Sequence, residues 1–247
     1  MLRGLLFLII FTCSFSFILN GQKTKKSTEK FSCGTILTDK RDNRKYKTII
    51  INNQCWMAEN LNTGKMIPVN YDLEDKTNYP KNDGEIEKYC FNNDTSLCLK
   101  YGALYNWDEM MKYSEIEGIN GICPDGWHIP AVNEWSELIR SAGGYLKAGE
   151  ILKDTCCWKK EGNARLSNSS GFSVKPAGRM QVPWKKIVFT ETGMFSYTWS
   201  STRFINDGLE YGWAYVMYFD NNYIDRYNIY KNYALSVRCI LDSYFDE

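Results

Sequence analysis

Residues 121–138 read GICPDGWHIPAVNEWSEL, and this stretch organises the rest of the chain. Its CPDG segment (residues 123–126) is typical of a tight turn, because proline fixes one φ angle and glycine accepts a positive one. Residues 127–129 (WHI) alternate as in a short strand, and Pro130 suits the first position of a helix. We therefore expect a turn, a strand and a helix to meet here and to nucleate the core.

An amphipathic helix is predicted directly after that strand, over residues 131–142. Trp135, Leu138 and Ile139 are spaced i, i+3 and i+4, which places them on one apolar stripe. The glycine pair at 143–144 is a typical helix end. This helix is expected to turn its tryptophan stripe toward the core.

The composition is that of a globular chain with one sizeable domain. Hydrophobic residues make up 44% and aromatic residues 15% of the 247 residues. The net charge is +1, from 30 basic and 29 acidic residues, so the chain lacks the basic balance of nucleic-acid-binding proteins. We expect no nucleic acid as a partner, and the charge does not favour a membrane surface either.

The first 21 residues are predicted to be a secretory signal peptide, cleaved near Gly21, because one arginine precedes an apolar run over residues 5–19. A membrane anchor would need about 20 apolar residues, so no span is expected after cleavage. Lipoprotein cleavage before Cys13 fits less well, because residues 10–12 (IFT) are not small. Residues 22–32 are predicted to be a polar linker and residues 243–247 a tail. The protein is expected to be secreted or attached to the cell surface.

Eight cysteines remain when Cys13 is removed with the signal peptide. An even number in an exported chain is typical of a disulfide framework, but eight cysteines allow 105 pairings and spacing alone does not choose among them. Cys156 and Cys157 are adjacent in the sequence. Three states stay open for this vicinal pair: a bridge to each other, bonds between molecules, or free thiols.

Five segments carry a resemblance to a known family. One is CPDGWHIPAVNEW itself; the others are YKTIIINNQCWMAENL from Tyr46, YGALYNW from Tyr101, SGFSVKPAGR from Ser170, and WSST from Trp199 with SVRC ending at Cys239. Over residues 33–242 the chain resembles the Fibrobacter succinogenes major paralogous domain. This is a family of secreted or surface-attached bacterial proteins, mostly of unassigned function.

The resemblance implies a fold similar to the C-type-lectin-like and formylglycine-generating-enzyme-like folds, which have a comparable helix start and a late Arg-Cys strand. We therefore expect a loop-rich α+β domain in which two helices pack on short, mostly antiparallel strands. The family usually has serine where this chain has Ala131, so a helix cap of about 1 kcal/mol should be missing. The resemblance also implies three disulfides: Cys33–Cys55, Cys90–Cys98 and Cys123–Cys239.

Four further elements are predicted along the chain. Residues 34–51 favour a β-hairpin with its turn at Asp42-Asn43, and Asp39 and Asp42 fit a solvated turn better than a calcium loop. Residues 101–113 favour a helix, because Leu104, Trp107, Met110 and Met111 form a helical stripe. Short strands are expected at 172–174 and 187–190, and the MAENL segment (57–61) is expected in the core.

The motifs of common enzymes and cofactor sites are missing from the sequence. His128 is the single histidine and no G-x-S-x-G elbow accompanies it, so we expect it to orient the turn by hydrogen bonding. The cysteines lack paired zinc spacing, and no glycine-rich nucleotide loop occurs. Calcium-lectin motifs such as Glu-Pro-Asn are also missing. We expect no cofactor and no metal.

The best candidate for a binding site is the aromatic segment 195–239, which holds eight of the seventeen tyrosines. Odd and even positions of residues 213–220 are both largely apolar, so one sheet face should reach the core and the other should carry exposed aromatic rings. Tyrosine with asparagine and serine is the mixture found in recognition surfaces. The candidate ligand-binding residues are Trp199, Trp213, Tyr215, Tyr218, Tyr223, Tyr227, Tyr230 and Tyr233.

These observations favour a non-enzymatic binding module that recognises a glycan or a surface protein through this aromatic face. A tyrosine-rich core without a ligand is the plainer interpretation of the same residues. One alternative is an enzyme related to the formylglycine-generating group, although the late cysteine pair of that group is missing because only Cys239 is present there. Another is a structural envelope protein without a soluble ligand.

Overall fold

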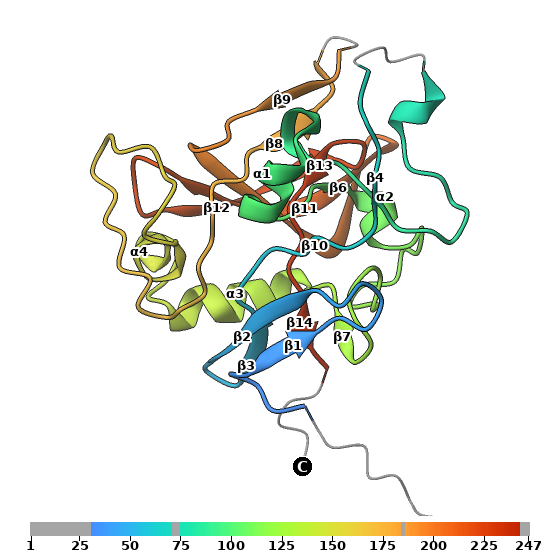
Figure 1. Cartoon of the computed structure of the whole chain (residues 1–247). Coiled ribbons are helices and arrows are strands. Elements are labelled where there is room, and N and C mark those ends of the chain that lie inside the picture. Colours follow the sequence, from blue (N-terminus) through green and yellow to red (C-terminus); the bar gives the residue numbers. More distant parts are fainter. Residues whose placement is uncertain (1–30, 71–74, 184–185, 243–247) are drawn as a thin grey trace, which may run out of the picture. The chain divides into compact units, whose positions relative to one another are not determined.

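The structure is a computed structural model that describes residues 31–70, 75–183 and 186–242. The chain divides into two compact units, residues 1–31 and 32–247, and all the described secondary structure lies in the second (Figure 1). The predicted signal peptide, residues 22–30 of the predicted linker and the predicted tail fall outside the described residues. The fold is mostly β-sheet, with short helices and long loops, as the α+β prediction requires.

A five-stranded antiparallel sheet joins the beginning and the end of the described chain, in the order β1-β2-β3-β14-β7. The predicted hairpin of residues 34–51 is confirmed as β1 and β2, and Asn43 takes a positive φ of 58° in its turn. Asparagine tolerates this conformation better than most residues. The strands are β1 (Ile36–Thr38), β2 (Lys45–Ile51), β3 (Gln54–Met57), β7 (Trp127–His128) and β14 (Ile240–Leu241).

Three smaller sheets complete the strand structure. The predicted strand at 187–190 is confirmed as β9, but no strand forms at 172–174, where Val174 makes one isolated bridge to Lys153. A three-stranded sheet contains β10 (Phe195–Asn206), β11 (Leu209–Tyr218) and β12 (Ile224–Tyr230). A four-stranded sheet contains β6 (Tyr105–Asn106), β13 (Ala234–Leu235), β8 (Arg179–Gln181) and β9 (Val188–Thr190), and a parallel pair contains β4 (Lys65–Met66) and β5 (Glu87–Lys88).

The described residues form four α-helices rather than the two predicted, and two short 3₁₀ turns. The helices are α1 (Thr95–Tyr101), α2 (Trp107–Met110), α3 (Val132–Ser141) and α4 (Ala148–Leu152), and the turns are η1 (Lys76–Asn78) and η2 (Phe91–Asn93). The helix predicted over 131–142 is confirmed as α3. Helix α1 escaped prediction although Asp94 caps it, with its side chain accepting from the Ser96 N–H.

The helix predicted over residues 101–113 is wrong. Gly102 ends α1 at a φ of 85°, and a Cβ at this position would collide with Asn60, so the backbone turns away from the helix here. Residues 105–106 then form β6, and only the four residues of α2 are helical. Leu104, Trp107, Met110 and Met111 are nevertheless all buried. The apolar stripe identified core residues correctly but gave the wrong backbone conformation.

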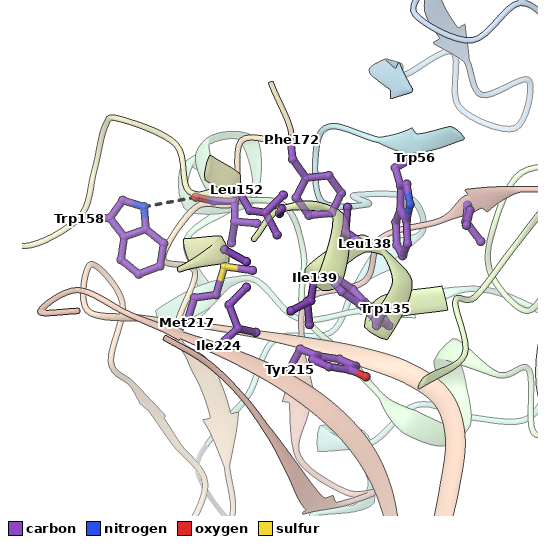
Figure 2. Close-up of a cluster of buried hydrophobic side chains, with 14 residues drawn as sticks. Trp56, Trp135, Leu138, Ile139, Leu152, Trp158, Phe172, Tyr215, Met217 and Ile224 are labelled. Atoms are coloured by element: carbon purple, nitrogen blue, oxygen red, sulfur yellow. Dashed lines mark hydrogen bonds between the residues drawn. The ribbon is translucent and has the colours of Figure 1, made fainter. Parts of the chain in front are cut away.

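Helix α3 packs between the five-stranded sheet and the β10–β11–β12 sheet (Figures 1 and 2). Trp135 of α3 contacts Trp56 of β3 on one side and stacks on Tyr215 of β11 on the other, each with ring centroids 5.0 Å apart. Phe172 closes the group with an edge contact to Trp56 at 5.6 Å. Burying each of these rings stabilises the fold by about 2 to 3 kcal/mol. Met57, Ala58 and Leu61 of the MAENL segment are also buried, as predicted.

Two side chains hold the CPDG turn in place, one that is close to the turn in the sequence and one from a distant segment. Asn120 donates through Nδ2 to the carbonyl oxygens of Cys123, Pro124 and Trp127. Arg41, in the turn of the first hairpin, donates to the carbonyl oxygens of Ile122 and Cys123. The turn therefore has a fixed position against the N-terminal hairpin.

Asp39 is buried and pairs with Arg41, which corrects the prediction that its turn is solvated. The Asp39 carboxylate accepts from Arg41 Nη2 at 2.6 Å and from Nε at 2.9 Å. Burial raises the pKa of Asp39, but the hydrogen bonds and charge of Arg41 outweigh it and the net pKa lies below its usual value. This ion pair orients the guanidinium toward the CPDG turn.

All three disulfides implied by the resemblance are present. They join Cys33 to Cys55, Cys90 to Cys98 and Cys123 to Cys239. The last spans 116 residues and ties the CPDG turn to the residue before β14. The first pins the start of the domain to β3. Two of the three disulfides therefore hold the five-stranded sheet, one at its N-terminal hairpin and one beside β14.

The cap missing at Ala131 is replaced by other residues. Glu134 accepts from the Ala131 N–H through Oε2 at 2.8 Å, which is half of a capping box. Thr202 of β10 adds an acceptor for a different N–H group, because its Oγ1 accepts from the Val132 N–H at 3.0 Å. An N–H group that would otherwise lack a helical partner is thereby satisfied from another strand.

Replacing Thr202 by valine is expected to lower the free energy of unfolding by about 1 kcal/mol, the usual value of a helix cap. Valine keeps the shape of the side chain and removes only the acceptor. Urea unfolding followed by tryptophan fluorescence measures the change. Ala131→Ser in the same background should restore part of the loss by capping from its own position. Equal stability of Thr202→Val and the unmutated protein would contradict the role given to Thr202.

Candidate functional site

The β10–β11 hairpin carries the candidate site and extends beyond the core. Asp207 and Gly208 form its turn with φ values of 49° and 75°, the conformation that a two-residue hairpin of this kind requires. The pairing register shifts between Trp199 and Arg203, which marks a bulge. At this bulge the Ser201 N–H donates to the Pro130 carbonyl, so the inner half of the hairpin is fixed to the IPAVNEW segment.

Four aromatic residues on one face of the outer hairpin form a continuous row. The centroid of Phe204 lies 5.1 Å from that of Trp213 and 6.2 Å from that of Tyr211, and Tyr211 lies 4.7 Å from Tyr230 of β12. The Arg226 guanidinium lies over the Trp213 ring at 4.5 Å. We call Phe204, Tyr211, Trp213 and Tyr230, together with Arg226, the outer aromatic strip.

The outer aromatic strip is rigid and accessible at the same time. Its strands are fully paired, because Tyr211 lies opposite Tyr230 and Trp213 lies opposite Asn228. Phe204, Tyr211 and Trp213 are half-buried by their neighbours, while Tyr230 and Arg226 are exposed. Rings that are already held in place lose little conformational entropy when a ligand stacks on them. This geometry suits recognition of a flat or extended ligand.

Two of the predicted site residues belong to the core, which corrects the candidate set. Trp199 is fully buried and donates from Nε1 to the Tyr105 carbonyl at 2.8 Å. Tyr215 is also buried; it stacks on Trp135 and donates from its hydroxyl to the Val132 carbonyl at 3.0 Å. Neither side chain is available to a ligand. Both are structural.

The remaining predicted residues do not share one face. Trp213 and Tyr230 lie in the outer aromatic strip, and Tyr233 is next to it, with its ring 5.9 Å from Tyr230. The register places Tyr218 and Tyr227 on the opposite face, where the Tyr218 hydroxyl donates to Asp225. Burial and these hydrogen bonds raise the pKa of Tyr218. The predicted site is therefore two separate tyrosine groups.

Tyr223 lies outside both tyrosine groups, in the loop between β11 and β12, and is 49% exposed. Because Ala214, Tyr215, Val216 and Met217 are all buried, both faces of the inner sheet are covered, and the predicted division into one core face and one exposed face is wrong there. Accessible rings occur on both sides of the bulge: Phe204, Tyr211 and Trp213 are partly exposed beyond it, and Tyr227 is 49% exposed on the inner part of the sheet.

Phe204, Tyr211 and Arg226 are strip residues that the sequence analysis missed. The signal was available in part, because Asp207-Gly208 is a strong two-residue hairpin turn and would place Phe204 opposite Tyr211. Tyr211 also continues the odd-numbered alternation of Trp213 and Tyr215. The side-by-side position of Arg226 and Trp213 depends on the β11–β12 register and carries no comparable local signal.

His128 is held between two carboxylates, as the prediction of an orienting role requires. Its Nε2 lies 2.8 Å from Glu134 Oε1, and its Nδ1 lies 2.5 Å from Asp242 Oδ1. Burial lowers the pKa of His128, but the bonds and charges of Glu134 and Asp242 together outweigh it and the net pKa is raised. Both ring nitrogens are occupied by carboxylates, which leaves none for a serine nucleophile.

Comparison with known proteins identifies a single family. The model of the Fibrobacter succinogenes major domain matches residues 49–241. The chain belongs to this family. No curated protein sequence matches the chain, and no solved structure matches it either. The matched range includes the CPDG turn, α3, the outer aromatic strip and both partners of the Cys123–Cys239 disulfide.

The His128 contacts make the stability of this Fibrobacter succinogenes major domain depend on pH. Because the folded-state pKa is raised, the contribution of His128 is fully present below its unfolded value of about 6.5 and is lost as the pH rises through the folded value. His128→Gln should therefore lower the free energy of unfolding by about 1 kcal/mol at pH 5.5 and by less at pH 8.5. Urea unfolding of both proteins at the two pH values measures this. If His128→Gln lowered the free energy of unfolding equally at the two pH values, the pH dependence assigned to His128 would be contradicted.

Cys156 and Cys157 are free thiols, exposed and half-buried respectively. The side-chain hydrogen bond between Cys156 and Cys157, together with burial, raises the pKa of Cys156 to about 11. The reactive form of cysteine is the thiolate, and little of it exists near neutral pH at such a pKa. Of the three states left open for this pair, the structure has free thiols.

Two further features of the major domain concern metals and membranes. Within residues 31–70, 75–183 and 186–242, no three His, Cys, Asp or Glu side chains gather closely enough to hold a metal ion. No helix in the part of the chain that the structure describes is long and apolar enough to cross a membrane.

Proposed function

We propose that the chain is a secreted or cell-surface, non-enzymatic binding module that recognises a glycan through the outer aromatic strip. The observation that carries this proposal is the row Trp213–Phe204–Tyr211–Tyr230, whose neighbouring rings lie 4.7 to 6.2 Å apart along fully paired strands. Aromatic faces of this kind stack on the apolar faces of sugar rings. Arg226 and Asn228 stand beside them as hydrogen-bond donors.

The hairpin tip supports the same proposal. Ile205 and Leu209 flank the turn and are each 51% exposed, so apolar surface continues past the strip to the end of the hairpin. Clustered exposed apolar side chains mark interaction sites more often than isolated ones do. The same surface would also suit a protein ligand, and the experiment below distinguishes a protein from a glycan.

The proposed fold is C-type-lectin-like. Support comes from α3, which begins at the segment IPAVNEW, and from SVRC, which ends at Cys239 immediately before β14. The pairing of β14 with β3 joins the late strand to the first hairpin and is consistent with this proposal. The three disulfides support the proposed export, because such bonds persist in oxidising compartments.

Binding of the purified protein to an array of glycans and surface polysaccharides, with and without EDTA, tests the proposal. Trp213→Ala and Tyr230→Ala should each weaken binding by about tenfold or more, the usual effect of losing a central aromatic contact. Tyr223→Ala is the matched control, since Tyr223 is 49% exposed against 46% for Tyr230 but lies outside the strip. It should bind as the unmutated protein does.

Three outcomes would redirect the proposal. Loss of binding in Tyr223→Ala or Tyr227→Ala, with Tyr230→Ala unaffected, would move the site off the strip. Loss of binding in EDTA would indicate a calcium-dependent lectin. An array without any bound glycan, together with a captured surface protein whose binding depends on Trp213, would replace the glycan by a protein ligand.

A further inference from the structure

A cavity of about 350 Å³ opens on a different part of the domain from the outer aromatic strip. Four segments surround it: the start of β2, the residues after β3, the C-terminal end of α1, and the stretch around Ser173. This size lies within the range of small-molecule sites. No residue of the strip contributes to the cavity, so the two surfaces are separate.

The lining of this cavity is strongly basic. Six cationic side chains and two carboxylates contribute to it: Arg44, Lys45, Lys47, Lys100, Lys175 and Arg238 against Glu59 and Asp154. The whole chain is nearly neutral, with a net charge of +1. The positive charge is therefore concentrated at the cavity, and field lines focus in such concave sites.

The two carboxylates of the cavity are engaged by backbone groups. Glu59 accepts from the Lys47 N–H through Oε2 at 2.8 Å, and Asp154 accepts from the Cys156 N–H through Oδ1 at 2.9 Å. Neither forms an ion pair with a cavity lysine in the described structure. Lys45, Lys47, Lys100 and Lys175 likewise have no ion-pair partner among the described residues. Of these four, Lys175 donates to the Lys100 carbonyl and Lys100 lies over the Tyr101 ring, so Lys45 and Lys47 are the two whose charges are free to meet a ligand.

Arg238 is a buried cation in the lining, and its hydrogen-bond acceptors are all neutral oxygens. Its Nε donates to Asn60 Oδ1 at 2.8 Å, and its two Nη atoms donate to the carbonyl oxygens of Phe172 and Ser173. Burial lowers the pKa of Arg238 to about 9, so the guanidinium is still charged at neutral pH. The charges of Glu59 and Asp154 offset the cost of burying this cation only in part, and an anion in the cavity would stabilise the guanidinium further.

The carbonyl end of α1 also faces the cavity, and its negative partial charge would repel an anion if its carbonyls were unpaired. Three of these oxygens are hydrogen-bonded by lining side chains. Asn62 Nδ2 donates to the Cys98 carbonyl at 2.9 Å, Asn60 Nδ2 donates to that of Tyr101 at 2.8 Å, and Lys175 Nζ donates to that of Lys100 at 3.2 Å. The partial negative charge of these helix carbonyls is thereby reduced at the lining.

We propose that this cavity binds the carboxylate, sulfate or phosphate group of a small acidic ligand. The oxyanion lies toward Arg238, with Lys45 and Lys47 of β2 at the opening, and Tyr46 and Tyr101 provide apolar wall beside them. This site is additional to the proposed glycan-binding strip and does not depend on it. Its ligand is defined by charge, whereas that of the strip is defined by stacking.

Calorimetric titration of the purified protein with sodium glucuronate, inorganic sulfate and inorganic phosphate tests this site. Ionic strength is held constant with sodium chloride, because screening weakens such contacts. Lys45→Gln/Lys47→Gln should raise the Kd of the bound anion by about fivefold or more, since two charges near the ligand are lost. Both lysines are exposed, and no side-chain hydrogen bond is given up among the described residues.

Lys40→Gln/Lys81→Gln is the matched control. These lysines are equally exposed and lie outside the cavity, and the variant has the same net charge as the test variant. Its Kd should stay within about twofold of the unmutated value, because more distant charges are screened. Trp213→Ala should also keep the anion affinity, so this site and the aromatic strip are tested independently.

Binding of any of the three anions that weakens only in the Lys45/Lys47 variant supports the cavity site, and the tightest of them names the oxyanion. Equal weakening in both double variants would show a general charge effect and would overturn the proposal. Failure of all three anions to bind at millimolar concentration would overturn it as well. Unfolding midpoints of the variants should match, because none of the four lysines is buried.

Discussion

Replacing Cys123 and Cys239 together by alanine is expected to lower the free energy of unfolding by about 5 kcal/mol. The bond closes a loop of 116 residues, and the entropy that such a cross-link removes from the unfolded chain grows with loop length. Both half-cystines are also buried, so the substitution leaves unfilled space beside β14. A loss of this size is comparable to the whole stability of many domains.

The Cys90/Cys98 double alanine variant is the comparison that isolates loop length. Its bond spans eight residues, for which the same entropy relation gives about 2.5 kcal/mol. Urea unfolding without reductant, at a pH near 6 that suppresses exchange with the free thiols, measures both variants. Equal losses from the two bonds would show that loop closure does not control the stability of this framework.

Gly121→Ala should be among the most destabilising single substitutions in the chain, while Gly126→Ala, five residues later, should be tolerated far better. Both glycines have positive φ, 53° and 80°, which costs any other residue about 1 to 2 kcal/mol. A Cβ at Gly121 would also collide with the Met110 carbonyl oxygen and press on Ile129. That collision should add about 1 to 3 kcal/mol.

Gly126 serves as the control within the same turn, because a Cβ there meets no atom within 4 Å. Both variants carry the cost of a positive φ, so this cost cancels when their free energies of unfolding are compared. The difference that remains is the cost of the collision with Met110 of α2. Thermal and urea unfolding of both variants give this difference. Indistinguishable stabilities would mean that the contact with Met110 relaxes without cost.

Local patterns in the sequence were sufficient for the elements whose signals lie within a few residues. Helix α3 follows from its apolar stripe and closing glycines, and the β1–β2 hairpin follows from the Asp42-Asn43 turn. Secondary structure is predictable from such patterns when periodicity and turn residues agree. The family resemblance, in contrast, was needed for the disulfide pairing, which no spacing rule decides.

The failures came where contacts with distant residues decide the conformation. Gly102 breaks the predicted helix because Asn60 approaches it closely from another segment. The candidate site was too large because Trp199 and Tyr215 are covered from outside the sheet by neighbours including Tyr105 and Trp135. Alternation shows which residues share a face, but not whether another layer covers that face. The hairpin beyond the bulge lacks such a covering layer, so its aromatic rings stay partly accessible.

The position of β14 inside the five-stranded sheet sets the order in which the domain can be assembled. This strand lies between β3 and β7, so the sheet has a central gap until residues 240–241 have been synthesised. The disulfide of Cys123 likewise forms only after Cys239 has been synthesised. Contacts between such distant residues form late and slowly. The domain therefore completes its core, and its longest-range disulfide, only after residues 239–241 have joined the rest of the sheet.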